Sequence, residues 1–150
     1  MRWLLLFSLC VCLSGCVTPS TLLVNDQGQV MRCAAYGSGA YGVATATSIH
    51  STCVNDMKKL GYVVLPDVTM GLVLEPGTTH VKTVTPSGSA AQAGIQVGDQ
   101  ILRVNTIPVA RGVEVLHMLQ GKKNGESIDV TLAREGKEST VPVRLTARGE

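Results

Sequence analysis

Five cysteines and three histidines carry most of the reactive chemistry in this sequence. A nucleophilic serine needs a base and an acid, and Ser38, His50 and Asp56 lie within one Ser/Thr-rich stretch. Ser38 has flanking glycines but no G-x-S-x-G context, in which a strand, a sharp turn and a helix expose the nucleophile. The thiols, taken with His50 and His80, lack the ligand spacing of a zinc site. We therefore predict no catalytic residue, no metal, no cofactor and no enzymatic activity.

An apolar run near the N-terminus ends at a cysteine. Arg2 supplies a positive charge, and the uncharged run from Trp3 to Leu13 is too short to span ~30 Å of hydrocarbon. The run closes with Leu13-Ser14-Gly15-Cys16, which resembles the lipobox of bacterial lipoproteins. The resemblance implies that residues 1–15 are a signal peptide and that Cys16 is the lipidated first residue of the mature protein. The alternative is a cleaved secretion signal that leaves Cys16 as an ordinary thiol.

The lipobox resemblance also predicts a location. Several acyl chains on one cysteine suffice for stable anchoring to a membrane. Val17 stands where an Asp would favour retention in the inner membrane of similar lipoproteins. We therefore expect a lipid anchor in a bacterial membrane, the outer membrane by preference, with the protein facing the periplasm.

Two cysteines remain beyond the lipobox, Cys33 and Cys53. An even number and an oxidising compartment favour one disulfide between them. Such a bond would close a loop of about 20 residues and contribute roughly 3 kcal/mol in the chain-entropy description. Two buried free thiols are the alternative.

Charge and composition exclude some partners. The chain has 13 basic and 11 acidic residues, and it has no long run of like charge. Nucleic acid is therefore not an expected partner. Aromatic residues are sparse, so the core must consist of Val, Leu, Ile, Met and Ala.

A glycine-rich segment, residues 37–42, matches G-x-G-x-x-G. A dinucleotide loop would also need a preceding strand, a βαβ unit and an acidic residue about 20 positions later on the next strand. Asp56 lies instead within the helix that we expect from Ala44 to Leu60. We interpret the glycines as permitting close packing of that helix.

The chain divides into three segments: the signal peptide (1–15), a lipid-attached region with the cysteine pair (16–66) and a C-terminal domain (67–148). In the middle region, strands are expected at 30–36 and 62–65 around the helix. Ile49, Cys53, Met57 and Leu60 lie on one face of that helix.

A long motif lies within the third segment. Residues 84–105 read VTPSGSAAQAGIQVGDQILRVN, which resembles the signature of bacterial PDZ domains. Ser87 or Ser89 is expected to cap a one-turn helix, Gly94 to end it, and Asp99 to accept hydrogen bonds from nearby backbone. Pro142 predicts an edge or a bulge in the last strand. The fold class is thus α+β: a PDZ-like, partly open β-barrel or sandwich with two helices, preceded by a small disulfide-linked α+β region.

The PDZ resemblance implies a peptide-binding groove. PDZ domains add an extended peptide to a sheet edge and hold its carboxylate with backbone amides. By resemblance, Met70, Gly71 and Leu72 supply those amides. The expected peptide-binding residues are Met70, Gly71, Leu72, Val73, Leu74, Val115, Met118 and Leu119, with the register on the second helix uncertain by one.

These features favour a membrane-anchored adaptor that binds C-termini or extended protein segments of the cell envelope. Two other functions stay open at this point. The protein could be a structural or oligomerising component of an envelope complex, or a regulatory partner of an envelope protease or secretion complex.

Overall fold

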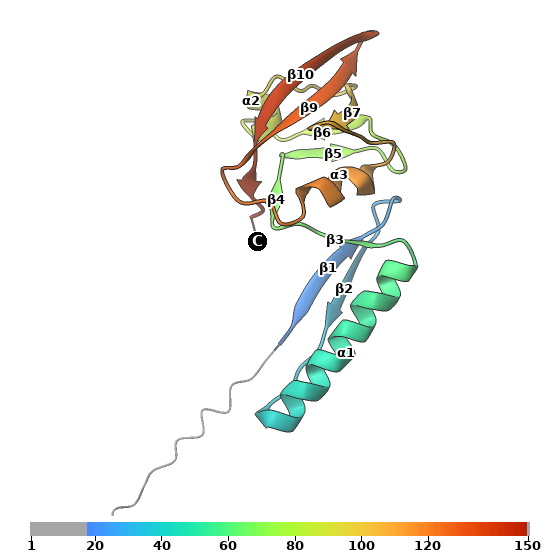
Figure 1. Ribbon diagram of the computed structural model, residues 1–150, viewed down its shortest axis with the longest axis vertical. Helices are drawn as coiled ribbons and strands as arrows, with labels where there is room; N and C mark the ends of the chain where they lie inside the picture. The colour runs from blue at the N-terminus through green and yellow to red at the C-terminus, as the bar shows by residue number, and fades with distance from the viewer. Residues whose placement is uncertain (1–17, 150) are drawn as a thin grey trace, which may run out of the picture.

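The computed structural model describes residues 18–149, so the predicted signal peptide and Cys16 lie outside the described part of the chain. The chain forms an N-terminal unit (residues 18–65) and a C-terminal unit (residues 66–149), stacked along the long axis of the molecule (Figure 1). The two units meet where the turn after the first strand, β1, approaches the start of the last helix, α3.

The N-terminal unit is a three-stranded sheet with one helix beside it. The sheet has the order β2-β1-β3. β1 pairs antiparallel with both neighbours, so that Thr21 lies opposite Cys33 and Val24 lies opposite Val63. The elements are β1 (Ser20–Val24), β2 (Val30–Ala34), α1 (Gly39–Lys59) and β3 (Val63–Val64).

Two links hold α1 against the sheet. A disulfide joins Cys33 of β2 to Cys53 of α1, with their Cα atoms 5.8 Å apart. On the neighbouring strand, the Thr21 hydroxyl lies 3.0 Å from Nε2 of His50. Both contacts come from the same side of the helix, so they fix its rotation about its own axis.

The buried side of α1 is not the apolar face that the spacing indicated. Ile49 and Leu60 are 57% and 68% exposed, whereas Ala46 is 1% exposed. The contacts of His50 and Cys53 set the rotation of α1 about its own axis. The three-stranded sheet is too narrow to cover the remaining apolar side chains of the helix as well. The helix also begins five residues earlier than expected, at Gly39.

The glycine-rich segment packs closely at the start of α1. A Cβ on Gly37 would overlap the carbonyl of Gly42 and crowd Ala46. Gly37 is also buried. These contacts agree with the interpretation that the glycines serve close packing.

The C-terminal unit has the expected α+β character, with short sheets and two helices. The sheets have the orders β10-β9-β7-β8, β11-β4 and β5-β6. The elements are β4 (Val68–Thr69), β5 (Leu72–Leu74), β6 (Val81–Val84), α2 (Ser89–Gln92), β7 (Gln100–Val104), β8 (Ile107–Pro108), α3 (Gly112–Leu119), β9 (Ser127–Arg134), β10 (Lys137–Arg144) and β11 (Thr146–Ala147).

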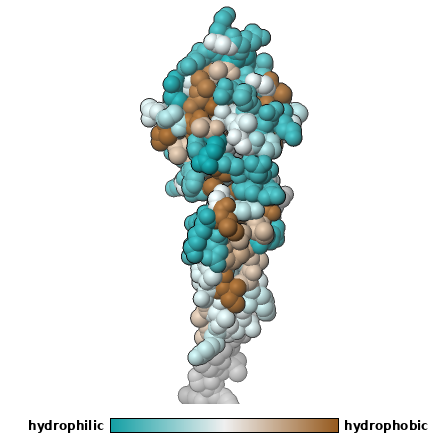
Figure 2. All heavy atoms as spheres, turned by 90° about the vertical axis from the view of Figure 1, so that its right-hand side faces the viewer, coloured by the Kyte–Doolittle hydropathy of each residue, from teal (hydrophilic) through white to brown (hydrophobic). Residues whose placement is uncertain are grey.

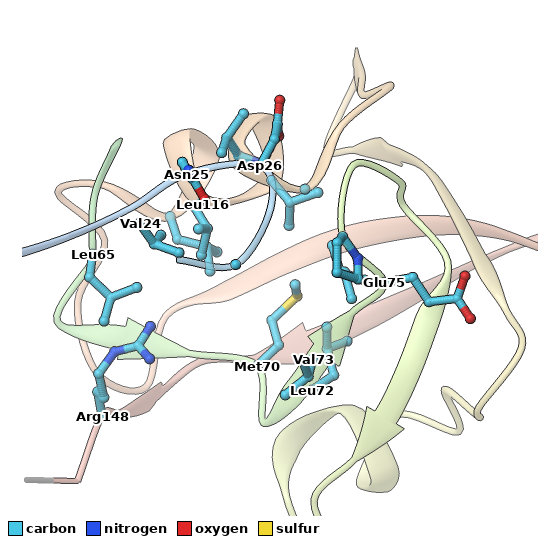
Figure 3. A pocket seen from close by; sticks show the side chains of 17 residues that line it. Val24, Asn25, Asp26, Leu65, Met70, Leu72, Val73, Glu75, Leu116 and Arg148 are labelled. Atoms are coloured by element: carbon cyan, nitrogen blue, oxygen red, sulfur yellow. The ribbon is translucent and has the colours of Figure 1, made fainter. Parts of the chain in front are cut away.

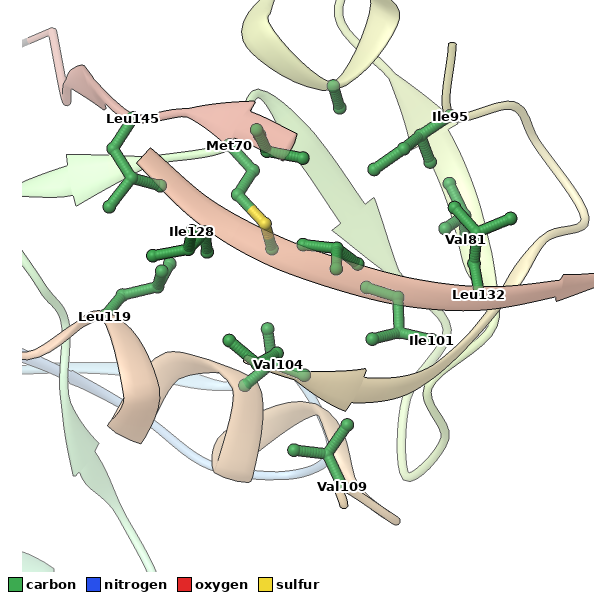
Figure 4. Packing of buried hydrophobic residues seen from close by; sticks show 14 of the residues in the cluster. Met70, Val81, Ile95, Ile101, Val104, Val109, Leu119, Ile128, Leu132 and Leu145 are labelled. Atoms are coloured by element: carbon green, nitrogen blue, oxygen red, sulfur yellow. The ribbon is translucent and has the colours of Figure 1, made fainter. Parts of the chain in front are cut away.

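One apolar core fills the C-terminal unit. It contains fifteen buried side chains, drawn from most of the strands and from α3. Ile101, Val104, Val130, Val143 and Leu145 are each 0% exposed. Figure 4 shows side chains of this cluster meeting between β7, β9 and α3. β10 is an edge strand, which is where Pro142 is tolerated, as expected.

Asp99 is a buried charge in this unit and is 1% exposed. Its carboxylate accepts hydrogen bonds from Arg134, at 2.6 and 2.7 Å, and from the backbone N–H of Gln96, at 2.8 Å. The hydrogen bond from Arg134 lowers the pKa of Asp99 below its ordinary value. The backbone contact was expected, and Arg134 is an additional partner that ties the end of β9 to the loop before β7.

The predicted serine cap on the one-turn helix is wrong. The N-cap of α2 is Gly88, and it makes no side-chain capping hydrogen bond. Ser89 is buried, and its hydroxyl contacts that of Thr146 at 3.4 Å. Gly94 follows the helix with φ +82°, as expected of a glycine that ends a helix.

Candidate functional site

A groove lies between β5 and α3. It encloses a cavity of about 190 Å³. Figure 3 shows side chains from β5 and α3 turned toward each other, with part of the N-terminal unit above them. The walls are largely apolar, so the groove suits an apolar side chain better than a charged one.

Most of the residues predicted for the groove line this cavity. Met70, Leu72, Val73 and Leu74 form the β5 side. On α3, Val115 and Leu119 line the cavity as expected. Val113 and Leu116 join them, whereas Met118 packs against the core. The cavity therefore lies on the Leu116 side of Val115 and Leu119, and Met118 lies on their other side, toward the core.

Gly71 occupies a sharp turn at one end of β5. Its φ of +75° is a left-handed conformation that favours glycine. A Cβ at this position would lie 3.4 Å from Cα of Gly88. The N–H of Gly71 donates to the Thr69 hydroxyl at 3.0 Å, and its carbonyl accepts from Thr85 at 2.8 Å. The turn is therefore tightly held, and one of its amides is satisfied by a side-chain oxygen.

β5 offers an open edge along the groove. Within residues 18–149 it pairs with one strand, β6, through Leu72 opposite Val84 and Leu74 opposite Val81. Its other edge faces α3 across the cavity (Figure 3). An unpaired strand edge carries N–H and C=O groups that can pair with another extended chain.

Arg148 lines the groove, although the sequence did not indicate it. Its Nε donates to the carbonyl of Pro66 at 3.0 Å, and its backbone N–H donates to the carbonyl of Asp67 at 2.8 Å. Desolvation lowers the pKa of the Arg148 guanidinium from its ordinary value, against the opposing effect of Asp67. The guanidinium is thus a partly desolvated cation at the end of an apolar groove.

The turn between β1 and β2 also contributes to the groove. Val24, Asn25, Asp26 and Gly28 line the cavity together with Leu65. These residues belong to the N-terminal unit, and nothing in the local sequence pattern pointed to such a role. The groove is therefore built from both units.

Residues 18–149 contain no cluster of three or more His, Cys, Asp or Glu side chains that could hold a metal ion. Among the same residues, no helix combines the length and the apolar character needed to cross a membrane.

The site joins an open strand edge, a facing helix and a tight glycine turn. The profile of the PDZ domain matches residues 66–145. The chain belongs to the PDZ domain family.

The relatives include bacterial proteases. The Probable periplasmic serine endoprotease DegP-like of Pseudomonas putida is 33% identical over 73 residues, which cover 49% of this chain and 15% of that protein. The serine endoprotease DegS of Salmonella typhimurium is 40% identical over 65 residues, or 43% of this chain and 18% of that protein. The chain thus spans less than a fifth of the length of either relative, and no protease domain lies within residues 18–149.

A solved structure shares the fold. The HtrA-type protease AlgW, solved with a decapeptide, aligns with a TM-score of 0.53 at 17% identity. The alignment covers 70% of this chain and 36% of AlgW. At this identity the likeness shows the fold alone.

Proposed function

We propose that this protein binds the C-terminal segment of another protein as an added strand on β5. The observation that carries the proposal is the unpaired edge of β5, which faces the apolar groove and starts at the left-handed turn of Gly71. Strand addition satisfies the backbone groups of both chains, and the pocket beneath selects a side chain.

The groove suits an apolar last residue with a free carboxylate. Met70, Leu72, Val115, Leu116 and Leu119 surround the space for the side chain. Because the modest contact area limits affinity, we expect dissociation constants near 1 μM, or about −8 kcal/mol.

The turn at Gly71 supplies the anion contact. Its N–H, now bound to the Thr69 hydroxyl, can donate to a carboxylate instead. Arg148 adds a positive charge in the same groove, which attracts an anion.

We further propose that the protein acts as a lipid-anchored adaptor of the cell envelope. The sequence Leu13-Ser14-Gly15-Cys16 supports anchoring through Cys16 in the outer membrane, facing the periplasm. The relative named as periplasmic supports that compartment. Labelling with radioactive palmitate tests the anchor: the wild-type protein takes up label, and a Cys16→Ala variant does not. Equal labelling of both would reject it.

An array of peptides with free C-termini tests the binding function. The full chain in detergent should select peptides that end in an apolar residue, and it should bind the amidated copies at least tenfold more weakly. Gly71→Glu and Leu72→Asp should each lose at least tenfold in affinity, whereas the control Val97→Asp, on an exposed side chain, should bind as wild type. Equal binding by all four proteins, or no selection by the array, would reject strand addition at β5.

Regulation of a separate protease is a second candidate function, favoured by the two relatives named as serine endoproteases. Envelope proteases are prepared from a strain that lacks this protein, and their activity on casein is measured. Addition of the purified protein should raise or lower that activity. An unchanged rate would reject this candidate and leave peptide binding intact.

A further inference from the structure

Asp26 spans the groove at the end opposite Gly71. Its carbonyl accepts a hydrogen bond from the N–H of Gly77, in the turn after β5, at 2.7 Å. Its carboxylate pairs with Arg111 at 3.1 Å and accepts from the N–H of Val113, at the start of α3, at 3.4 Å. One residue of the N-terminal unit thus connects the two walls of the groove. We call this contact the Asp26 clasp.

The turn that carries Asp26 is held in shape before it reaches the groove. The Asn25 side chain accepts from the N–H groups of Gln27 and Gln29, at 3.0 and 2.9 Å. Gly28 takes φ +75° and donates its N–H to the Asn25 carbonyl at 3.0 Å. Behind it, the paired strands β1 and β2 are tied to α1 by the disulfide. The clasp is therefore presented by an ordered turn.

The stretch of β5 between Gly71 and the clasp is short. The strand has three residues, Leu72–Leu74, and each residue of an added strand advances about 3.3 Å. A peptide that starts at Gly71 therefore meets the turn at Glu75 and Gly77 after about three residues. Figure 3 shows Asp26 beside α3 and Glu75 beyond the end of β5, at this side of the groove.

The ion pair of the clasp contributes little to keeping it closed, because both side chains are partly exposed. The Arg111 side chain is 57% exposed and that of Asp26 is 24% exposed. Exposed pairs of this kind contribute about 1 kcal/mol or less. The structure shows the clasp closed, and a ligand with enough additional contacts can displace an ion pair of this kind.

We propose that Asp26 sets the length of segment that the groove accepts. The closed groove binds a tail of about three residues, and a longer extended segment gains affinity only when the clasp opens. This inference rests on the proposed binding of C-terminal segments. It adds to that function a selecting residue from outside the family-matched region.

A pair of peptide lengths tests the inference. The short probes are acetylated tripeptides ending in Val, Leu or Phe with a free carboxylate. The long probes add the strand-forming sequence Thr-Lys-Val-Thr-Val-Lys-Thr before the same three residues. Affinities are measured by calorimetry for the wild-type chain, Asp26→Ala, Asp26→Asn and the control Asp56→Ala, whose carboxylate pairs with Lys59 on the exposed face of α1.

We expect the wild-type protein to bind the short and long probes within threefold of each other. Asp26→Ala should leave the short probes unchanged within threefold and tighten the long probes at least tenfold. For the long probes, the affinity of Asp26→Asn should lie between those of the wild type and Asp26→Ala, because this variant loses the charge but keeps an oxygen that can accept from Val113. Asp26→Asn also tests the inference if Asp26→Ala fails to fold. Asp56→Ala should match the wild type.

The possible failures are distinguishable. Long probes that already bind the wild type tenfold more tightly than short ones, or that gain nothing in either Asp26 variant, overturn the clasp and leave peptide binding intact. An absence of binding by every probe to every folded variant rejects the binding function and the clasp with it.

Discussion

The two units of this chain are stabilised in different ways. The C-terminal unit has a single core of fifteen buried apolar side chains. In the N-terminal unit the buried apolar residues are Leu23, Val24, Cys33, Ala46 and Val63, and one of these is part of a disulfide. Where apolar burial is scarce, a covalent bond and a few polar contacts hold the helix to the sheet.

The surface of the N-terminal unit reflects the same scarcity. Ile49, Leu60, Tyr36 and Tyr41 are all more than half exposed. In Figure 2, apolar side chains on one face of the molecule form separated spots rather than a continuous belt. The apolar content of a segment therefore does not predict its core, because a small sheet cannot cover all of it.

The largest expected effect comes from the same substitution made in the two units. Leu145→Ala should lower the free energy of unfolding by about 3–4 kcal/mol, because the side chain is 0% exposed and its loss leaves a cavity. Leu60→Ala, at a side chain 68% exposed, should change it by less than about 0.5 kcal/mol. Urea unfolding monitored by circular dichroism checks both. Similar losses in the two variants would contradict the contrast between the units.

Removal of the disulfide should affect one unit only. The double variant Cys33→Ser, Cys53→Ser should destabilise the N-terminal unit by about 3 kcal/mol, since the bond closes a 20-residue loop. Hydrogen exchange read by mass spectrometry should show faster exchange in β1, β2 and α1 and unchanged exchange in β7 and β9. Reducing agent should reproduce the effect in the wild type and add nothing in the variant. Equal acceleration in β9 would show that the units unfold together.

Sequence patterns predicted the elements of the C-terminal unit well because its signals are local. Gly94 and Gly71 occupy left-handed turns that favour glycine, and Pro142 lies in the edge strand β10. In the N-terminal unit the apolar spacing indicated a helix, but the apolar face that it defines is not the buried one. The contacts of His50 and Cys53, which set that face, depend on how the helix docks on the sheet.

The groove was predictable on one side only. The segment from Met70 to Leu74 is continuous, so a single motif located it. Leu116 rather than Met118 faces the cavity, because the packing of α3 on the core decides which flank of Val115 and Leu119 is turned toward the groove. Asp26 and Arg148 contact residues 85 and 82 positions away in the sequence, and no local pattern encodes such contacts.

Acid should weaken the C-terminal unit through Asp99. Arg134 lowers the pKa of Asp99 in the folded state, so the unfolded chain binds a proton more readily. The stabilisation is present above about pH 4 and is lost as the pH falls through the lowered folded pKa. Asp99→Asn should reduce the loss of unfolding free energy in acid, measured by urea unfolding at a series of pH values. Arg134→Gln should cost more stability at pH 7 than Asp99→Asn, because it leaves a buried carboxylate without its cation; the reverse order would contradict the assignment.

The smallest expected effect should be the same in both units. Lys59 pairs with Asp56 in the N-terminal unit, and Arg103 pairs with Glu138 in the C-terminal unit, each at 2.9 Å. All four side chains are more than 40% exposed, so water and salt screen both pairs. Lys59→Ala and Arg103→Ala should each change the free energy of unfolding by less than about 0.5 kcal/mol. Urea unfolding at low and high salt checks this, and a loss above 1 kcal/mol in one unit alone would show that surface charge, as well as burial, distinguishes the two units.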